Sequence, residues 1–177
     1  MVRSYSESKK GSSTMEMVKA VINGLALDIT TNSPVVILTP ENSEKILPIW
    51  IGHYEAWAIG MELSGVTSKR PLTHDLLASV ITSIHGSVDR IEITELKEQT
   101  FYAAIYIKDG KEVVRIDARP SDSIALALKS KSPIFVNNEL FSLSPEQKES
   151  QGLPANEESL KERLKRINPE DFGKYSL

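Results

Sequence analysis

Apolar residues follow two different spacings along this chain. Alternating or short continuous apolar runs that are rich in β-branched residues predict strands. The runs with this pattern are 18–29, 33–39, 45–51, 88–96, 100–107, 112–118 and 133–136. Apolar positions three or four residues apart predict helices over 54–63, 73–84 and 121–129. An Asp-Gly pair at Asp109 and Gly110 predicts a hairpin between two of the strands.

The predicted helix ends carry signals of their own. Thr73 is the expected N-cap of the second helix, with Asp75 in the first turn, where a carboxylate favours the helix dipole. Gly86 is expected to end this helix, with His85 as a capping residue beside it. Pro120 suits the first position of the third helix. The second helix is expected to bury one apolar stripe, formed by Leu76, Leu77, Val80, Ile81 and Ile84.

The order of three strands followed by a helix occurs twice. A shift of 67 positions lays residues 47–63 over 114–130 without a gap. We therefore expect an α+β fold of internally duplicated β-β-β-α units, which form a largely antiparallel sheet with helices packed on it. The shift also places the turn at 52–55 opposite the turn at 119–122.

The polar segments at both ends predict one domain with tails. Residues 1–16 are serine-rich and are expected to be a disordered tail, and residues 17–143 are expected to form the domain. Residues 144–177 are expected to hold a linker, a charged helix over 157–167 and a polar tail. The apolar stripe of that helix is narrow, which suits docking on the domain or on a partner.

Composition and charge restrict the class of protein. The 177 residues include 40% hydrophobic and 25% charged residues, as in a soluble globular protein. The absence of cysteine excludes disulfides and thiolate metal sites, and it fits a cytoplasmic location. We expect no membrane span, because no apolar run approaches ~20 residues. A net charge of −3 argues against a broad basic surface for nucleic acid, but not against transient binding at one cleft.

The sequence IDARPSD at 116–122 is the strongest candidate site. Asp117 and Arg119 lie two residues apart at a strand end, and Asp122 lies in the first helical turn. An arginine at a helix start suits phosphate recognition, and two carboxylates suit a divalent cation. The alternative is structural, with Arg119 bridging two carboxylates while Asp122 favours the helix N-terminus.

Two further polar stretches are weaker candidates. RPLTHDLL at 70–77 brings His74, which can act as an acid or base near neutral pH, next to Asp75. WIGHYEAW at 50–57 holds Glu55 at the place that matches Asp122 in the other half. Its two tryptophans are expected in the core or at an interface, which leaves room for a homo-oligomer. We expect no organic cofactor, because no phosphate loop or dinucleotide fingerprint occurs.

Four stretches together resemble the bifunctional nuclease family: LPIWIGHYEAWAI (47–59), RPLTHDLL (70–77), TFYAAI (100–105) and IDARPSDSIALAL (116–128). Plant members of that family are described as degrading RNA and DNA. The resemblance implies a nuclease with nucleic acid as a transient substrate, assisted by Mg²⁺ or Mn²⁺. One departure from the family pattern is Ser123, where alanine is common.

The resemblance gives candidate roles to particular residues. The catalytic candidates are His74, Asp75, Asp117, Arg119 and Asp122. The candidate metal ligands are Asp117, Asp122 and Glu55, and the candidate substrate-binding residues are Arg70, Arg119 and Ser121. One alternative is a non-catalytic module that binds an anionic small molecule or a partner protein. Another is a structural protein whose C-terminal helix recruits a partner.

Overall fold

The computed structural model describes residues 15–154 and 157–167. Its strands are β1 (Met17–Asp28), β2 (Ser33–Pro40), β3 (Leu47–Trp50), β4 (Gly86–Lys97), β5 (Thr100–Asp109), β6 (Glu112–Ala118), β7 (Ile134–Asn137) and β8 (Leu164–Ile167). Its α-helices are α1 (His53–Ser64), α2 (Thr73–Ser83), α3 (Pro120–Ser130), α4 (Pro145–Ser150) and α5 (Glu157–Arg163). A 3₁₀ turn, η1 (Asn138–Ser142), follows β7. The expected tails at 1–14 and 168–177 lie outside the described residues.

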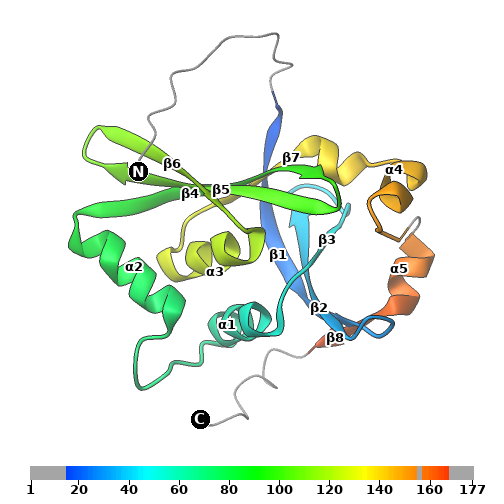
Figure 1. The fold of residues 1–177 in the computed structure, drawn as a ribbon, viewed down its shortest axis with the longest axis horizontal. Coiled ribbons are helices and arrows are strands. Elements are labelled where there is room, and N and C mark those ends of the chain that lie inside the picture. The colour runs from blue at the N-terminus through cyan, green and yellow to red at the C-terminus, as the bar shows by residue number, and fades with distance from the viewer. Residues whose placement is uncertain (1–14, 155–156, 168–177) are drawn as a thin grey trace.

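The strands form one sheet in the order β3-β2-β1-β7-β4-β5-β6, and β8 pairs with β1 beyond that path. Every pairing is antiparallel except that of β4 with β7. The predicted α+β class and the largely antiparallel sheet are therefore confirmed. Helices α1, α2 and α3 lie together, and α3 packs against α1, α2, β4 and β5 (Figure 1).

The structure does not confirm the internal duplication. Each half of the sheet is a three-stranded antiparallel meander, β1-β2-β3 or β4-β5-β6, as the repeat predicts. The strand registers differ, however. A shift of 67 carries the Leu38–Leu47 pair onto Ile105 and Val114, whereas Ile105 pairs with Ile116. The internal duplication therefore remains a prediction that rests on the sequence pattern.

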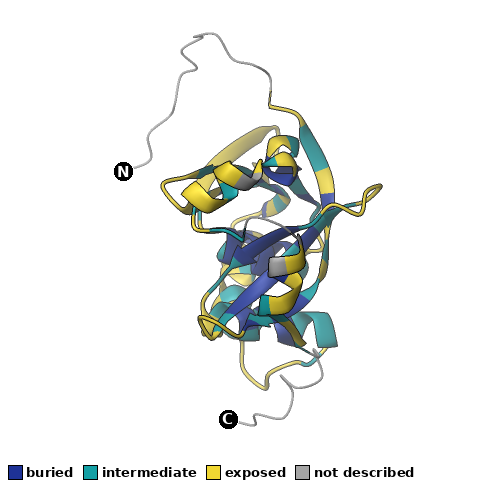
Figure 2. Ribbon diagram, turned by 90° about the vertical axis from the view of Figure 1, so that its right-hand side faces the viewer, coloured by how far each residue is buried: buried dark blue, intermediate teal, exposed yellow. Residues whose placement is uncertain are grey.

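The core lies between the sheet and the three grouped helices. Figure 2 shows the buried strand segments in the middle of the molecule with exposed residues around them. Helix α3 contributes most of one side, because its residues Ile124–Ala127 are all buried. The chain enters α3 through Pro120, whose fixed φ suits the first helical position, so the predicted start of this helix is confirmed. Deep burial of α3 holds the residues at its N-terminus in place.

Several local expectations were wrong. Leu72 is the N-cap of α2, and Thr73 is its first residue. Gly86 is the first residue of β4, and His85 makes the turn with a φ of 65°. Only Ile81 of the predicted α2 stripe is buried, because α2 lies at the rim of the helical layer.

The C-terminal segment also differs from expectation. Part of the expected linker forms α4, which Ser144 caps by accepting a hydrogen bond from the backbone N–H of Gln147. The expected helix over 157–167 ends at Arg163, and residues 164–167 pair with β1 as β8. Backbone pairing to the domain thus replaces a free helical end. In the described part of the chain, no helix is both long and apolar enough to cross a membrane.

Candidate functional site

Arg119 and Asp122 form a bidentate pair at the start of α3. The Arg119 Nε donates to Asp122 Oδ2 at 2.7 Å, and Nη2 donates to Asp122 Oδ1 at 3.1 Å. Arg119 is the N-cap of α3 with extended backbone angles, so its side chain folds back over the first turn. The Ser123 hydroxyl donates to the Arg119 carbonyl at 3.0 Å, so the serine that departs from the family pattern adds a local hydrogen bond.

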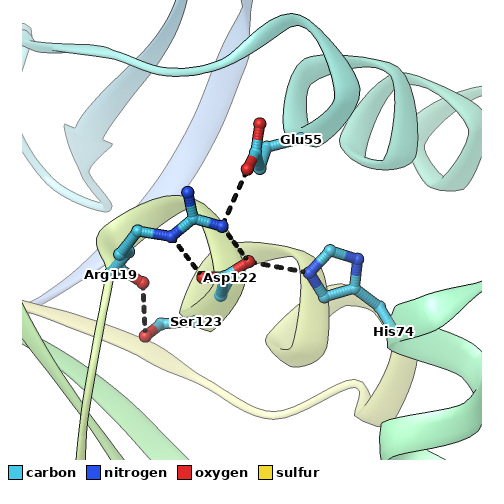
Figure 3. Close-up of polar contacts among 5 residues, drawn as sticks. All are labelled: Glu55, His74, Arg119, Asp122 and Ser123. Carbon is cyan, nitrogen blue, oxygen red and sulfur yellow. Dashed lines mark hydrogen bonds and ion pairs between the residues drawn. The ribbon is translucent and has the colours of Figure 1, made fainter.

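Arg119 also reaches a second helix. Its Nη2 lies 2.7 Å from Glu55 Oε1, in the first turn of α1. The guanidinium therefore bridges two carboxylates, as Figure 3 shows. Such a bridge is the structural alternative that the sequence predicts, but with Glu55 in the place expected for Asp117.

Gly52 makes room for the Glu55 carboxylate. A Cβ atom at position 52 would lie 2.1 Å from Glu55 Oε2, far inside any permitted contact. Gly52 is the N-cap of α1, where glycine is tolerated, and a side chain there would require the flexible end of Glu55 to move. Sequence reasoning missed this residue, although a glycine three positions before a glutamate at a helix start was a visible signal.

His74 completes the group from a third helix. Its Nε2 lies 3.1 Å from Asp122 Oδ1, and its side chain is only 12% exposed. We define the four-residue cluster as Glu55, His74, Arg119 and Asp122. The folded chain thus joins α1, α2 and the start of α3 through Arg119, which contacts Glu55, and Asp122, which contacts His74 (Figure 3).

The electrostatics of the four-residue cluster favour an ionised Asp122. Burial raises the pKa of Asp122, but the hydrogen bonds from Arg119 and His74 lower it by more, so the net pKa lies below the ordinary value. The hydrogen bond with Asp122 raises the pKa of Arg119 further above its already high value. Asp122 therefore accepts hydrogen bonds as a carboxylate at neutral pH.

Asp75 has a different environment from its neighbour His74. Its Oδ2 accepts the backbone N–H of Leu72 at 2.8 Å, and Oδ1 lies 2.5 Å from Lys129 Nζ. Lys129 also pairs with Glu62, so one lysine of α3 ties α1 and α2 together. Burial raises the pKa of Asp75, and the hydrogen bonds from Lys129 and Leu72 outweigh it, so the net pKa is lowered. These contacts fit a capping and bridging role.

Asp117 and Arg70 lie apart from the four-residue cluster. Asp117 is exposed on the edge strand β6, and Arg70 is exposed in the loop before α2. Neither forms an ion pair within the described ranges 15–154 and 157–167. No group of three or more histidine, aspartate or glutamate side chains in these ranges is arranged to hold a metal ion. The predicted set of Asp117, Asp122 and Glu55 is thus not brought together.

Arg119 stands between two cavities. We call the first the Trp57 cavity; its volume is about 510 Å³, and its lining residues include Tyr54, Trp57 and all four residues of the cluster. We call the second the Trp50 cavity; its volume is about 490 Å³, and Ser121 lies in its wall. Both tryptophans are partly exposed at cavity walls, so of the two expected places, the core or an interface, the core is wrong. Sequence reasoning missed this role because aromatic residues near a turn more often pack inside.

Comparisons with known proteins agree with the resemblance. The model of the bifunctional nuclease domain matches residues 36–149, a range that holds the whole four-residue cluster. An uncharacterised protein of Mycobacterium tuberculosis strain H37Rv is 36% identical over 157 residues, which cover 84% of this chain and 94% of that protein.

Plant proteins named as nucleases are more distant relatives. Bifunctional nuclease 1 of Oryza sativa subsp. indica is 24% identical over 116 residues, which cover 64% of this chain and 35% of the plant protein. Bifunctional nuclease 2 of Arabidopsis thaliana is 24% identical over 112 residues, which cover 62% and 34%. The chain thus matches about a third of each plant protein.

Proposed function

The chain belongs to the bifunctional nuclease domain family, and from this premise we propose that it hydrolyses phosphodiester bonds in RNA and DNA at the four-residue cluster. The observation that carries the proposal is the contact of His74 and Arg119 with one carboxylate, Asp122, at the wall of a cavity. A base and a phosphate-binding cation thereby face the same space.

Arg119 is the phosphate-binding group in this proposal. Its side chain is 66% exposed, and its Nη1 makes no hydrogen bond to the described residues. The N–H groups of a guanidinium donate charge-assisted hydrogen bonds to phosphate oxygens. Asp122 and Glu55 hold Nε and Nη2, so the free Nη1 group is fixed in position before the substrate arrives, which favours stabilisation of charge that develops on the phosphate.

His74 is the proton-transfer group. When the Asp122 carboxylate accepts the Nε2 hydrogen, the neutral ring carries its lone pair on Nδ1. Nδ1 takes the proton of a water molecule whose oxygen bonds to phosphorus. The bond from phosphorus to the leaving oxygen then breaks, and that oxygen receives the proton back. Asp122 positions the ring and stabilises its charged form, as a carboxylate does in a hydrolase triad.

The carboxylates do not fit a Mg²⁺ or Mn²⁺ centre as they stand. The guanidinium of Arg119 already contacts both Glu55 and Asp122, and Asp117 lies outside the group. A dication beside them would meet the arginine charge instead of free carboxylate oxygens. The proposed steps therefore use only protein side chains and water. Dependence of cleavage on added Mg²⁺ or Mn²⁺ is a separate proposal, which the cleavage assay tests.

The test is cleavage of end-labelled single-stranded RNA and DNA by the full chain, with Mg²⁺, with Mn²⁺ and with EDTA. The His74→Gln variant removes the base, and His53→Gln is the matched control because His53 is exposed at the start of α1. Cleavage lost only in His74→Gln supports the proposal. Equal cleavage by both folded variants would place the activity elsewhere or in a contaminant.

A further inference from the structure

The Trp50 cavity has walls from five separate parts of the chain. They are the end of β3, the β4–β5 turn, the start of α3 and the segment after α4, and Ser33 at the start of β2 adds the fifth part. Arg119 is its single charged lining residue, and no carboxylate lines it. The Trp57 cavity, in contrast, contains the carboxylates of Glu55 and Asp122. The Trp50 cavity therefore favours an anionic group near Arg119.

Ser121 presents an unpartnered hydroxyl at this cavity. The residue is only 6% exposed, and its Oγ makes no hydrogen bond to the described residues. Its hydroxyl is not sealed from solvent, because no fully buried side-chain atom of the described chain lacks a partner. The first hydrogen bond within α3 runs from Ser123 N to Arg119 O, so the backbone N–H of Ser121 is free as well. Arg119, this hydroxyl and the N-terminus of α3 all line the Trp50 cavity, and together they offer donors that suit a phosphate group.

The opposite wall carries groups that suit a nucleobase. Trp50 and Phe101 supply aromatic surface, and the side chain of Gln99 offers an amide that both donates and accepts hydrogen bonds. Gln99 holds a left-handed φ of 61°, which is unfavourable for a residue other than glycine. Its backbone N–H donates to Gln151 Oε1 at 2.7 Å, so the segment after α4 secures this turn.

From these contacts we propose that the Trp50 cavity binds a nucleotide, with its phosphate at Arg119 and Ser121 and its base against the Trp50 and Gln99 wall. The inference rests on the proposed function, since it makes this cavity the place for the nucleotide that neighbours the scissile phosphate. Arg119 then contacts a polynucleotide where it passes from one cavity to the other.

The two tryptophans of the chain allow a direct test, because each lines one cavity. The Trp57→Phe variant retains Trp50 as its only tryptophan, and its fluorescence is titrated with adenosine 5′-monophosphate, adenosine and inorganic phosphate. We expect saturable quenching by the nucleotide, at least about fivefold weaker binding of adenosine, and weaker nucleotide binding after Ser121→Ala but not after Ser83→Ala.

A Gln99→Gly variant tests the role of the Gln99 side chain without disturbing the fold of the turn. Glycine accepts the left-handed conformation, so this variant retains the turn and loses only the side-chain amide. We expect unchanged thermal stability or a small gain, together with weaker nucleotide binding.

The outcomes separate the two proposals. Cleavage without any nucleotide response at Trp50 would overturn the nucleotide subsite and leave the nuclease proposal intact. Nucleotide binding without cleavage would overturn the nuclease proposal and leave the nucleotide subsite intact. Equal binding of phosphate and nucleotide would reduce the cavity to an anion site and overturn its role in base binding.

A different observation concerns the free edge of the sheet. The sheet ends at β6, a seven-residue strand with Val113, Val114 and Ile116 all exposed. Native proteins usually protect such an edge, because its unpaired N–H and C=O groups invite another strand. The described residues offer no such cover for β6.

The residues of β6 suit pairing with a second copy of itself. With Ile116 opposite Ile116 of the second copy, an antiparallel register sets Arg115 opposite Asp117 of that copy, and the reverse. The two-fold axis thereby places each arginine of one copy opposite an aspartate of the other copy. The register also gives Asp117 a partner that it lacks within the described chain. We infer that β6 forms a homodimer interface in this register.

The oligomeric state tests this inference by light scattering over a range of protein concentrations. We expect a dimer for the unchanged chain, a monomer for Ile116→Lys, and a dimer for the control Ile29→Lys, which is exposed away from β6. Arg115→Asp and Asp117→Arg should each weaken the dimer, and the double variant should restore it. A monomeric unchanged chain, or a dimer that survives Ile116→Lys, would refute the interface; failed restoration would refute the register.

Discussion

His74 and Asp122 are 48 residues apart in the chain, and a 3.1 Å contact between Nε2 and Oδ1 joins them in the fold. The contact links α2 to the start of α3, and the same carboxylate is held by Arg119. Asp122 thus joins His74 to Arg119, and Arg119 joins Asp122 to Glu55, so single substitutions at these residues test the cluster.

Replacement of Asp122 by asparagine should reduce cleavage strongly. The amide can offer its NH₂ group to His74 Nε2, which then keeps its lone pair there and carries its hydrogen on Nδ1, the wrong nitrogen for the proposed base. We expect kcat/KM to fall by about 10²-fold or more, the usual contribution of a general base. Initial rates on RNA and DNA measure the effect, with Asp109→Asn in an exposed turn as the matched control. Wild-type rates in a folded Asp122→Asn protein would contradict the mechanism.

Arg119→Lys should weaken substrate binding although the charge is kept. Lysine cannot hold the Nε and Nη2 contacts to Asp122 while it also donates a pair of hydrogen bonds to phosphate. We expect KM for single-stranded DNA to rise about tenfold, since a tenfold change corresponds to about 1.4 kcal/mol, the scale of one charge-assisted hydrogen bond. Steady-state kinetics at two salt concentrations measure it. An unchanged KM would remove Arg119 from phosphate binding.

Gly52→Ala should disturb the site through Glu55. The new methyl group would lie 2.1 Å from the position of Glu55 Oε2, so the carboxylate has to leave Arg119. We expect a loss of at most about 1 kcal/mol in the free energy of unfolding, because the flexible end of Glu55 can move aside and its ion pair is with a largely exposed arginine. Thermal and denaturant unfolding measure it. The Gly52→Ala/Glu55→Ala double variant should recover most of that loss, and purely additive effects would show that the contact is not the cause.

Asp28 should make stability sensitive to acid. The residue is fully buried and accepts hydrogen bonds from Arg163 Nη2 at 2.6 Å and Trp50 Nε1 at 2.8 Å. Burial raises the pKa of Asp28, but the hydrogen bonds from Arg163 and Trp50 outweigh it and hold the pKa far below the usual range. A lowered folded-state pKa stabilises the fold above the unfolded-state pKa of about 3.9, and this contribution is lost progressively as pH falls from that value through the lower folded-state pKa.

The Asp28→Ala variant tests whether the ionised Asp28 side chain stabilises the fold. It should lose about 3 kcal/mol of unfolding free energy at pH 7, the scale for a broken buried ion pair, because Arg163 is left without its partner. Denaturant unfolding at pH 7 and at pH 3 measures it. The gap between wild type and variant should narrow at pH 3, and a constant gap would show that the Asp28 charge does not contribute.

Local residue pattern alone determined most of the elements of this fold. The seven predicted strands, the hairpin between β5 and β6 and the Pro120 start of α3 depend on alternation, turn chemistry and a fixed φ, which act within a few neighbouring residues. The turn residues of that hairpin are Gly110 and Lys111, one position later than the predicted Asp109–Gly110 pair. The same kind of signal identified Arg119 and Asp122 as a pair, since they lie in one turn of chain. The local residue pattern did not predict the C-terminal strand β8, because four residues that pair with a distant strand carry no local signature.

Tertiary structure decided which polar residues meet. Asp117 was the partner expected for Arg119 beside Asp122, and Glu55 was not, yet the sheet places Asp117 on an outer edge while helix packing carries Glu55 to the guanidinium. Likewise, His74 reaches Asp122, whereas its neighbour Asp75 turns to Lys129. Adjacent helical residues differ in direction by about 100°, so the packing of α2 on α3 sends one side chain to the site and the next to a structural bridge.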